Sequence, residues 1–196
     1  IQQTDRGGRT TRFEYNAASE LIRTILPDDT PSDDSDNPQF STEYNLAGEV
    51  TVEIDALGRR TSYERDGAGR IVRVVAPDGS STRRVFDPSG RQVSTIDALG
   101  NRTNYEYDAA DRLTVTTSVD GSRTMTVYDE AGRVSARIDS GGRATRLTYT
   151  AGGLLDSVVD PLGNKMTHTY DELGRRTVTT DSLDRSTRYE YDAVGN

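Results

Sequence analysis

Polar and apolar residues alternate in short runs along most of the chain. Thr103-Asn104-Tyr105-Glu106-Tyr107 and Val50-Thr51-Val52-Glu53-Ile54 are two such runs. Alternation with a period of two residues predicts β-strands, because successive side chains of a strand point to opposite faces. We therefore expect Tyr105 to pack with Tyr107, and Val50, Val52 and Ile54 to pack together. Segments rich in Asp, Asn and Gly separate the runs and predict tight turns.

An aromatic residue followed by Asp or Asn marks one of these turns and recurs every 21 residues from position 44 to 191. Arg65 takes the aromatic position once, and Thr150 takes the acidic position once. The step before position 44 is eight residues longer than the others, and the excess lies in the acidic stretch 27–38. The aromatic column comprises Tyr15, Tyr44, Phe86, Tyr107, Tyr128, Tyr149, Tyr170 and Tyr191.

A second turn signature lies about half a period away and centres on a glycine column. Its members are Gly58, Gly79, Gly100, Gly121, Gly142 and Gly163, with Asp184 at the equivalent position of the last repeat. Each repeat is then two strands and two turns, and consecutive repeats form an antiparallel β-meander. About eight repeats give roughly 17 strands and on the order of 80 Å of sheet. Open sheets wider than about ten strands curl. We expect one array over residues 1–196, with an acidic loop insertion at 27–38, that winds into a spiral or hollow shell wall.

Composition changes this picture only in part. Leu, Ile, Val and Phe together make up 37 of 196 residues and the net charge is −8, which alone would favour disorder. The regular alternation and ten tyrosines instead indicate a sheet with one packed face and one hydrated face. The absence of cysteine excludes disulfides and thiolate metal sites. The sequence shows no signal peptide and no membrane-spanning run. An acidic chain with dispersed arginines is not expected to bind nucleic acid.

The recurring pattern Tyr-Asp-x-x-Gly-Arg, followed by Asp-x-Leu-Gly-Asn-Arg-Thr-x-Tyr-x-Tyr-Asp, resembles the RHS repeats, also called YD repeats. The clearest stretch is 97–112, and the resemblance covers nearly the whole chain. In that family the repeats wind into a large hollow β-shell. Members include Rhs polymorphic toxins, the B and C subunits of insecticidal toxin complexes, bacterial wall-associated proteins and animal teneurins. In the toxin members, the resemblance implies a shell around a variable C-terminal toxin domain.

Some family features have no counterpart in the sequence. We find no segment resembling the RHS core that plugs the shell, and no distinct C-terminal domain. The last residues, 191–196, begin another repeat unit. We therefore expect the chain to be a segment of a larger protein. Excised from it, the segment would expose two unpaired sheet edges and associate in solution.

Candidate chemistry is weak compared with the repeat pattern. His168 occupies a strand position that holds Tyr63, Tyr105 or Leu147 in other repeats, so a structural role is expected. The aspartates recur at turn starts, and none is singled out as a catalytic pair. The acidic stretch 27–38 is expected to be a solvated excursion, with weak calcium binding as the alternative. The Asn101-Arg102-Thr103 sequon is interpreted as accidental. The tyrosine columns are expected to pack between strands, with stacking on sugars as the alternative.

We therefore expect a structural scaffold with no catalytic residues, no cofactor and no metal. The expected partners are the rest of the same shell, an enclosed C-terminal toxin or effector, and components of a secretion system or toxin complex. The expected location is secreted or at the cell surface, in a bacterial polymorphic toxin. The alternative function is an extracellular adhesion or carbohydrate-binding module, and an enzyme is a more distant third.

Overall fold

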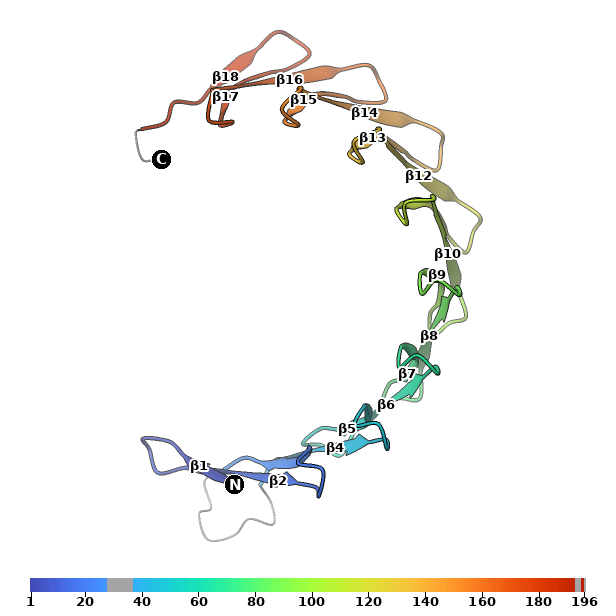
Figure 1. The fold of residues 1–196 in the computed structure, drawn as a ribbon, viewed down its shortest axis with the longest axis vertical. Coiled ribbons are helices and arrows are strands. Elements are labelled where there is room, and N and C mark those ends of the chain that lie inside the picture. The colour runs from blue at the N-terminus through green and yellow to red at the C-terminus, as the bar shows by residue number, and fades with distance from the viewer. Residues whose placement is uncertain (28–36, 193–194, 196) are drawn as a thin grey trace. The chain divides into compact units, whose positions relative to one another are not determined.

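The computed structural model describes residues 1–27, 37–192 and 195, and these residues form eighteen β-strands and no helix. They divide into two units, Ile1–Arg102 and Thr103–Asn196, each of which is described by itself. In each unit, successive hairpins lie side by side in chain order (Figure 1). Every strand pairing within a unit is antiparallel, for example β4 with β5 and β5 with β6. The predicted all-β antiparallel meander is confirmed.

The strands follow one another at the predicted spacing. The first unit holds β1 (Gln2–Thr4), β2 (Thr10–Tyr15), β3 (Leu21–Ile25), β4 (Gln39–Tyr44), β5 (Val50–Ile54), β6 (Arg60–Arg65), β7 (Ile71–Val75), β8 (Ser81–Phe86) and β9 (Gln92–Ile96). From residue 103 the second unit holds most of β10 (Arg102–Tyr107), then β11 (Leu113–Thr117), β12 (Arg123–Tyr128), β13 (Val134–Ile138), β14 (Ala144–Tyr149), β15 (Leu155–Val159), β16 (Lys165–Tyr170), β17 (Arg176–Thr180) and β18 (Ser186–Arg188).

The hairpin turns share one backbone design. In the turn 97–101, the N–H of Asp97 donates to the carbonyl of Asn101 (3.0 Å), and the N–H of Gly100 donates to the carbonyl of Asp97 (3.1 Å). Gly100 has φ +87°, in the left-handed region that glycine adopts at little cost. This is the three-residue hairpin loop in which a left-handed residue follows a type I turn. The glycine column was predicted for this reason, and all six of its members have positive φ.

The sheet in each unit is a single layer, because every strand packs only on its neighbours along the chain. Ile25, Val52 and Val115 are the buried apolar residues of the described part. The expectation of one packed face is therefore not met within either unit. Neither face is covered by a second layer, and most strand side chains are half-buried by their lateral neighbours. Backbone hydrogen bonds and cross-strand side-chain pairs therefore make most of the contacts between neighbouring strands.

A β-bulge separates residues that the sequence pattern predicted to pack together, so the prediction for Val50, Val52 and Ile54 is wrong. Tyr44 lies opposite Val50, whereas its neighbour Glu43 lies opposite Val52, so Thr51 is an extra residue in β5. Neighbours on β4 point to opposite faces, and so do their partners. Val50 is thus separated from Val52 and Ile54, which the alternation had grouped with it. The same shift occurs in each hairpin whose turn follows the aromatic position.

The expected insertion at 27–38 falls mostly outside the described residues, since only Pro27, Asn37 and Pro38 of it are described. The N–H of Leu26 donates to the carbonyl of Pro38 (2.9 Å), which closes the β3–β4 connection at its base. The described part of the chain contains no helix long and apolar enough to cross a membrane.

Candidate functional site: the two turn edges

The meander places its turns alternately at the two ends of the strands. We call the turns that follow the aromatic position the aromatic edge; they span 16–20, 45–49, 66–70, 87–91, 108–112, 129–133, 150–154 and 171–175. We call the other turns the opposite edge; they span 5–9, 55–59, 76–80, 97–101, 118–122, 139–143, 160–164 and 181–185. These two rows of turns hold most of the charged side chains that pair with each other.

Most turns on both edges are closed by a carboxylate at their first residue. In the turn 108–112, Asp108 Oδ1 accepts hydrogen bonds from the N–H of Ala110 (2.9 Å) and the N–H of Arg112 (3.0 Å). Its Oδ2 accepts one from Arg112 Nε (2.8 Å). In the turn 97–101 of the opposite edge, Asn101 takes the place of the arginine, and its Nδ2 donates to Asp97 Oδ2 (2.8 Å). The aspartates predicted at turn starts are thus fully engaged as hydrogen-bond acceptors.

These hydrogen bonds favour the ionised carboxyl. In eleven turns the fifth residue, through its backbone N–H or its side chain, is the main cause that lowers the pKa of the first-residue aspartate. For none of these eleven aspartates is a second carboxyl among the causes of the lowered pKa, and a lowered pKa makes each a weaker proton acceptor at neutral pH. Among the described residues, no cluster of three or more His, Cys, Asp or Glu could hold a metal ion.

On the aromatic edge the arginine also contacts the next turn. The guanidinium of Arg133 lies over the ring of Tyr149, 4.4 Å from its centroid. The Tyr149 hydroxyl donates to the carbonyl of Val134 (2.8 Å), the residue that follows Arg133. The aromatic residue just before one turn therefore lies across the previous turn. Its ring contacts the arginine of that turn, and its hydroxyl donates to the backbone just after it. A stacked guanidinium contributes about 0.5–2 kcal/mol, and a hydrogen bond about 1 kcal/mol.

The same contacts recur along the aromatic edge. The stacked pairs are Arg70 on Phe86, Arg112 on Tyr128, Arg133 on Tyr149 and Arg175 on Tyr191, with distances of 4.4–4.8 Å to the ring centroid. The hydroxyl bonds are Tyr44 to Leu21, Tyr128 to Leu113, Tyr149 to Val134, Tyr170 to Leu155 and Tyr191 to Arg176. Phe86 has no hydroxyl and keeps only the stacking. Tyr15, the first member of the predicted column, is 43% exposed.

We call each contact between the fifth residue of a turn on the aromatic edge and the aromatic position before the next turn a step. In one step the cation and its partner have exchanged places. Arg65 replaces the aromatic residue, and Glu49 replaces the arginine of the preceding turn. Arg65 Nη2 donates to the carbonyl of Val50 (3.3 Å), the position that a tyrosine hydroxyl reaches elsewhere. Its Nε lies 4.0 Å from Glu49 Oε2. The cation has moved from one side of the contact to the other, so the two turns stay linked.

Glycines of the aromatic edge make room for the preceding turn. A Cβ at Gly90 would lie 3.2 Å from Arg70 Nη1, and a Cβ at Gly174 would lie 3.6 Å from Leu154 Cδ1. On the opposite edge, no atom would lie within 4 Å of a Cβ at Gly58, Gly79, Gly100, Gly121, Gly142 or Gly163. Its turns end in exposed apolar tips such as Leu99, which is 87% exposed. The glycines of the opposite edge thus serve backbone conformation alone.

His168 has the strand position predicted for it. It lies on β16 opposite Thr179, and its Nδ1 is 3.2 Å from Thr179 Oγ1. The side chain is 7% exposed, and burial lowers the pKa of the imidazole, with a further contribution from the Arg176 cation. In a catalytic triad the histidine contacts a nucleophile through one nitrogen and an orienting carboxylate through the other. The geometry is that of a cross-strand pair.

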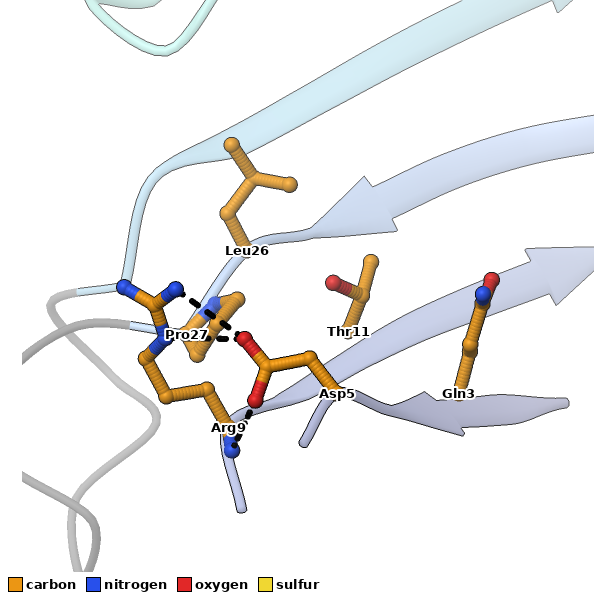
Figure 2. A pocket seen from close by; sticks show the side chains of 6 residues that line it. All are labelled: Gln3, Asp5, Arg9, Thr11, Leu26 and Pro27. Atoms are coloured by element: carbon orange, nitrogen blue, oxygen red, sulfur yellow. Dashed lines mark hydrogen bonds and ion pairs between the residues drawn. The ribbon is translucent and has the colours of Figure 1, made fainter. Parts of the chain in front are cut away.

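A hollow of about 420 Å³ beside the first turn of the opposite edge also lacks reactive groups. Figure 2 shows Asp5 and Arg9 at its wall, joined to each other between Asp5 Oδ2 and Arg9 Nε (3.0 Å), with Leu26 and Pro27 beside them. Asp5 Oδ1 accepts from the N–H groups of Gly7 and Arg9. Both charged groups are thus engaged with each other and with the turn.

The sequence interpretation missed how the turns are linked. The tyrosines were assigned to packing and the aspartates to turns, and the arginine of the motif Tyr-Asp-x-x-Gly-Arg, which is the fifth turn residue, was given no role. The signal was the constant spacing of 16 residues from Arg112 to Tyr128 and from Arg133 to Tyr149. A second signal was that Glu49 and Arg65, exceptions in two different columns, have the same spacing.

Comparisons with known proteins agree with the repeat pattern. The RHS Repeat family model matches residues 44–81, 86–123 and 128–165, more than half of the chain, and each match spans two of the 21-residue repeats. No curated protein sequence matches the chain. A crystal structure of TcdB2-TccC3-TEV is similar over the whole chain, with 17% identity and a TM-score of 0.48. A Tc holotoxin pore structure from Photorhabdus luminescens has 18% identity and a TM-score of 0.43. The chain spans 14% of the length of each of these solved chains.

Proposed function

Because the chain belongs to the RHS repeat family, we propose that it is a length of the wall of a hollow β-shell that encloses a toxin or effector domain. A structural scaffold is the role that RHS repeats support for this chain. The observation that carries the proposal is the linked aromatic edge. The recurring arginine and aromatic side chains of this edge join one hairpin to the next, and they do not gather around a cavity.

The width of the strip supports a curved wall. The strands within each unit add on the order of 40 Å of sheet at about 4.8 Å per strand. A twisted antiparallel sheet of ten or more strands curls or closes. Ring and hydroxyl contacts link the turns of the aromatic edge, and none of these contacts joins the described turns of the opposite edge. Such a difference between the edges favours bending of a strip in one direction. We infer that the parent protein uses many such repeats to surround a space.

The proposed mechanism is physical containment. Strands such as β6, β10 and β17 carry mostly Thr, Ser, Arg, Asn, Glu and Tyr side chains, and few aliphatic ones. A wall with a polar inner face can hold a partly unfolded domain without binding it tightly, since little apolar surface is removed from water. The proposed partners are the rest of the shell, the enclosed domain and other components of a toxin complex. We place the protein outside the producing cell or on its surface.

We also infer that this segment catalyses no reaction. Its recurring aspartates are engaged in turns, and His168 is a half of a cross-strand pair. Replacing His168 by Leu, the residue at the equivalent position 147, should leave any activity of the parent protein unchanged. A loss of activity with an intact fold would assign this segment a role in chemistry.

Adhesion to carbohydrate is the competing function, and the ring contacts disfavour it. Four aromatic rings of the repeat column are covered on one face by an arginine of the same chain. Sugar stacking needs such a face to be open. A glycan array probed with the parent protein would show saturable binding if adhesion were the function.

Electron cryomicroscopy of the parent protein tests the proposal, combined with limited proteolysis. We expect a closed wall with a lumen that contains density, and an enclosed domain that resists protease until the wall is unfolded. A solid particle or an open sheet without a lumen would contradict containment, and so would an effector domain that is cleaved as fast as an isolated one.

A further inference from the structure

One step of the aromatic edge lacks the complementary pair found in the others. Four steps place an arginine over an aromatic ring, and one pairs Glu49 with Arg65. Another places Leu154 before Tyr170, which matches an apolar side chain with a ring. In the step between the turns 16–20 and 45–49, the fifth turn residue is Glu20 and the aromatic residue is Tyr44. A carboxylate beside the negative face of a ring is not complementary.

Glu20 takes the path that arginine takes elsewhere. A Cβ at Gly48 would lie 2.7 Å from Glu20 Oε1, just as one at Gly90 would lie 3.2 Å from Arg70 Nη1. Tyr44 also has the usual position, since its hydroxyl donates to the carbonyl of Leu21 (2.9 Å). The framework of the step is therefore conventional, and only the cation is missing. Glu20 Oε2 accepts a hydrogen bond from the neutral Asn16 Nδ2 (2.6 Å).

A hollow of about 650 Å³ lies at this step. Its wall includes Ala17, Ala18, Glu20, Tyr44 and Leu46. The small side chains of Ala17 and Ala18 leave the space open, and its volume suits an amino-acid side chain or a small ligand. The two other charged wall residues already have partners. Arg23 Nη1 lies 3.3 Å from Glu14 Oε2, and Glu43 Oε1 lies 3.0 Å from Arg60 Nη1.

We propose that this hollow binds the guanidinium group of an arginine on a partner polypeptide, with Tyr44 and Glu20 as its receptors. The repeat itself shows what fits: four copies of the step hold a guanidinium against the ring, and the Glu49 step places one near the carboxylate. The partner's arginine replaces the cation that this step lacks. The site therefore ties a partner polypeptide to the wall, and this role does not depend on what the wall encloses.

Titration with N-acetyl-arginine amide, followed by NMR on the isotope-labelled chain, tests the site. We expect saturable shifts of the Gly48 and Tyr44 resonances, with a dissociation constant on the order of 10 mM, because one stacked cation and one exposed ion pair contribute little. Gly90 should not shift, because Arg70 already fills its step. N-acetyl-citrulline amide has the same shape without charge and should bind at least tenfold more weakly.

Two variants separate the site from a nonspecific effect of the probe. Glu20→Arg restores the common arginine, so it should fold and abolish the saturable shifts. Glu20→Gln keeps the size of the side chain and should weaken binding at least threefold. The proposal is overturned if the wild-type chain shows no saturable shift, if the citrulline derivative binds equally well, or if folded Glu20→Arg binds like the wild type. Should Glu20→Arg not fold, unchanged binding by Glu20→Gln would also overturn it.

Discussion

The two ends of β13 carry nearly the same turn in two different settings. At one end Asp129 accepts a hydrogen bond from Arg133 Nε (2.8 Å), and at the other Asp139 accepts one from Arg143 Nε (2.8 Å). Yet the Arg133 side chain is 34% exposed and lies over Tyr149, whereas the Arg143 side chain is 73% exposed. Turns with the same Asp, Gly and Arg positions thus give a link between turns on one edge and an isolated turn on the other.

What differs is the residue that the neighbouring hairpin supplies. On the aromatic edge the next strand ends in a ring, next to a bulge that bends the chain and changes side-chain direction. On the opposite edge the next turn offers only polar or exposed side chains, such as Asn164. Stability in a repeat protein is a sum of unit and nearest-neighbour terms. Here we infer that the side-chain part of the neighbour term lies mainly on the aromatic edge.

Acid should lower the stability of the protein more than any single substitution, because it protonates the aspartates that close the turns on both edges. The pKa values of the turn aspartates are lowered in the folded chain by hydrogen bonds from the fifth turn residue on both edges. A lowered folded pKa stabilises the protein above the unfolded pKa of about 3.9, and this stability is lost as the pH falls. We expect circular dichroism to show a stable sheet from about pH 5 to 8 and cooperative unfolding below about pH 4. If residue-specific NMR showed acid unfolding at one edge alone, the hydrogen bonds to the turn aspartates would not stabilise both edges alike.

Removing a ring of the aromatic column should be the most damaging single substitution. Tyr149→Ala removes the stacking with Arg133 and the hydrogen bond to Val134, and we expect a loss of about 2–3 kcal/mol in the free energy of unfolding. The matched substitution on the opposite edge is Leu162→Ala. Leu162 is 86% exposed, so its change should stay within about 0.5 kcal/mol. Urea denaturation of both variants measures the difference, and equal losses would end the distinction between the edges.

Substitutions of the two arginines at the ends of β13 should differ less in their effect on the free energy of unfolding. Arg133→Ala should cost about 1 kcal/mol, because it removes a partly desolvated cation from a ring. Arg143→Ala should cost less than about 0.5 kcal/mol, as expected for an exposed ion pair. Arg133→Lys serves as the control, since it keeps the charge and loses the planar stacking. Full stability of Arg133→Lys would mean that charge alone links the turns.

Glycine substitutions should show the smallest contrast. Gly90 and Gly100 flank β9 and have φ +88° and +87°, so alanine costs about 1–2 kcal/mol at either position. Only at Gly90 must a neighbour, the end of Arg70, also move. We expect Gly90→Ala to be less stable than Gly100→Ala by a few tenths of a kcal/mol in parallel urea titrations. A more stable Gly90→Ala would show that the close approach has no cost.

Much of the fold followed from the sequence, because period and turn chemistry are local properties. The positive φ of Gly100 and Gly142 was predictable from glycine after an Asp-led turn. The separation of Val50 from Val52 was not, since a bulge inserts a residue without any change in the apolar pattern. The stacking of Arg133 on Tyr149 joins residues 16 apart in different hairpins, so single-strand periodicity could not reveal it. The mismatch of Glu20 and Tyr44 became visible only once the contacts of the other steps were known.

A double-mutant cycle on Arg133 and Tyr149 tests most directly whether the turns are linked on one edge alone. The cycle compares each alanine variant with the double variant by urea denaturation, and a parallel cycle on Arg143 and Asn164 does the same for the opposite edge. Our account predicts a coupling free energy of about 1 kcal/mol for Arg133 with Tyr149, and none above about 0.3 kcal/mol for Arg143 with Asn164. Equal couplings on the two edges, or none between Arg133 and Tyr149, would contradict it.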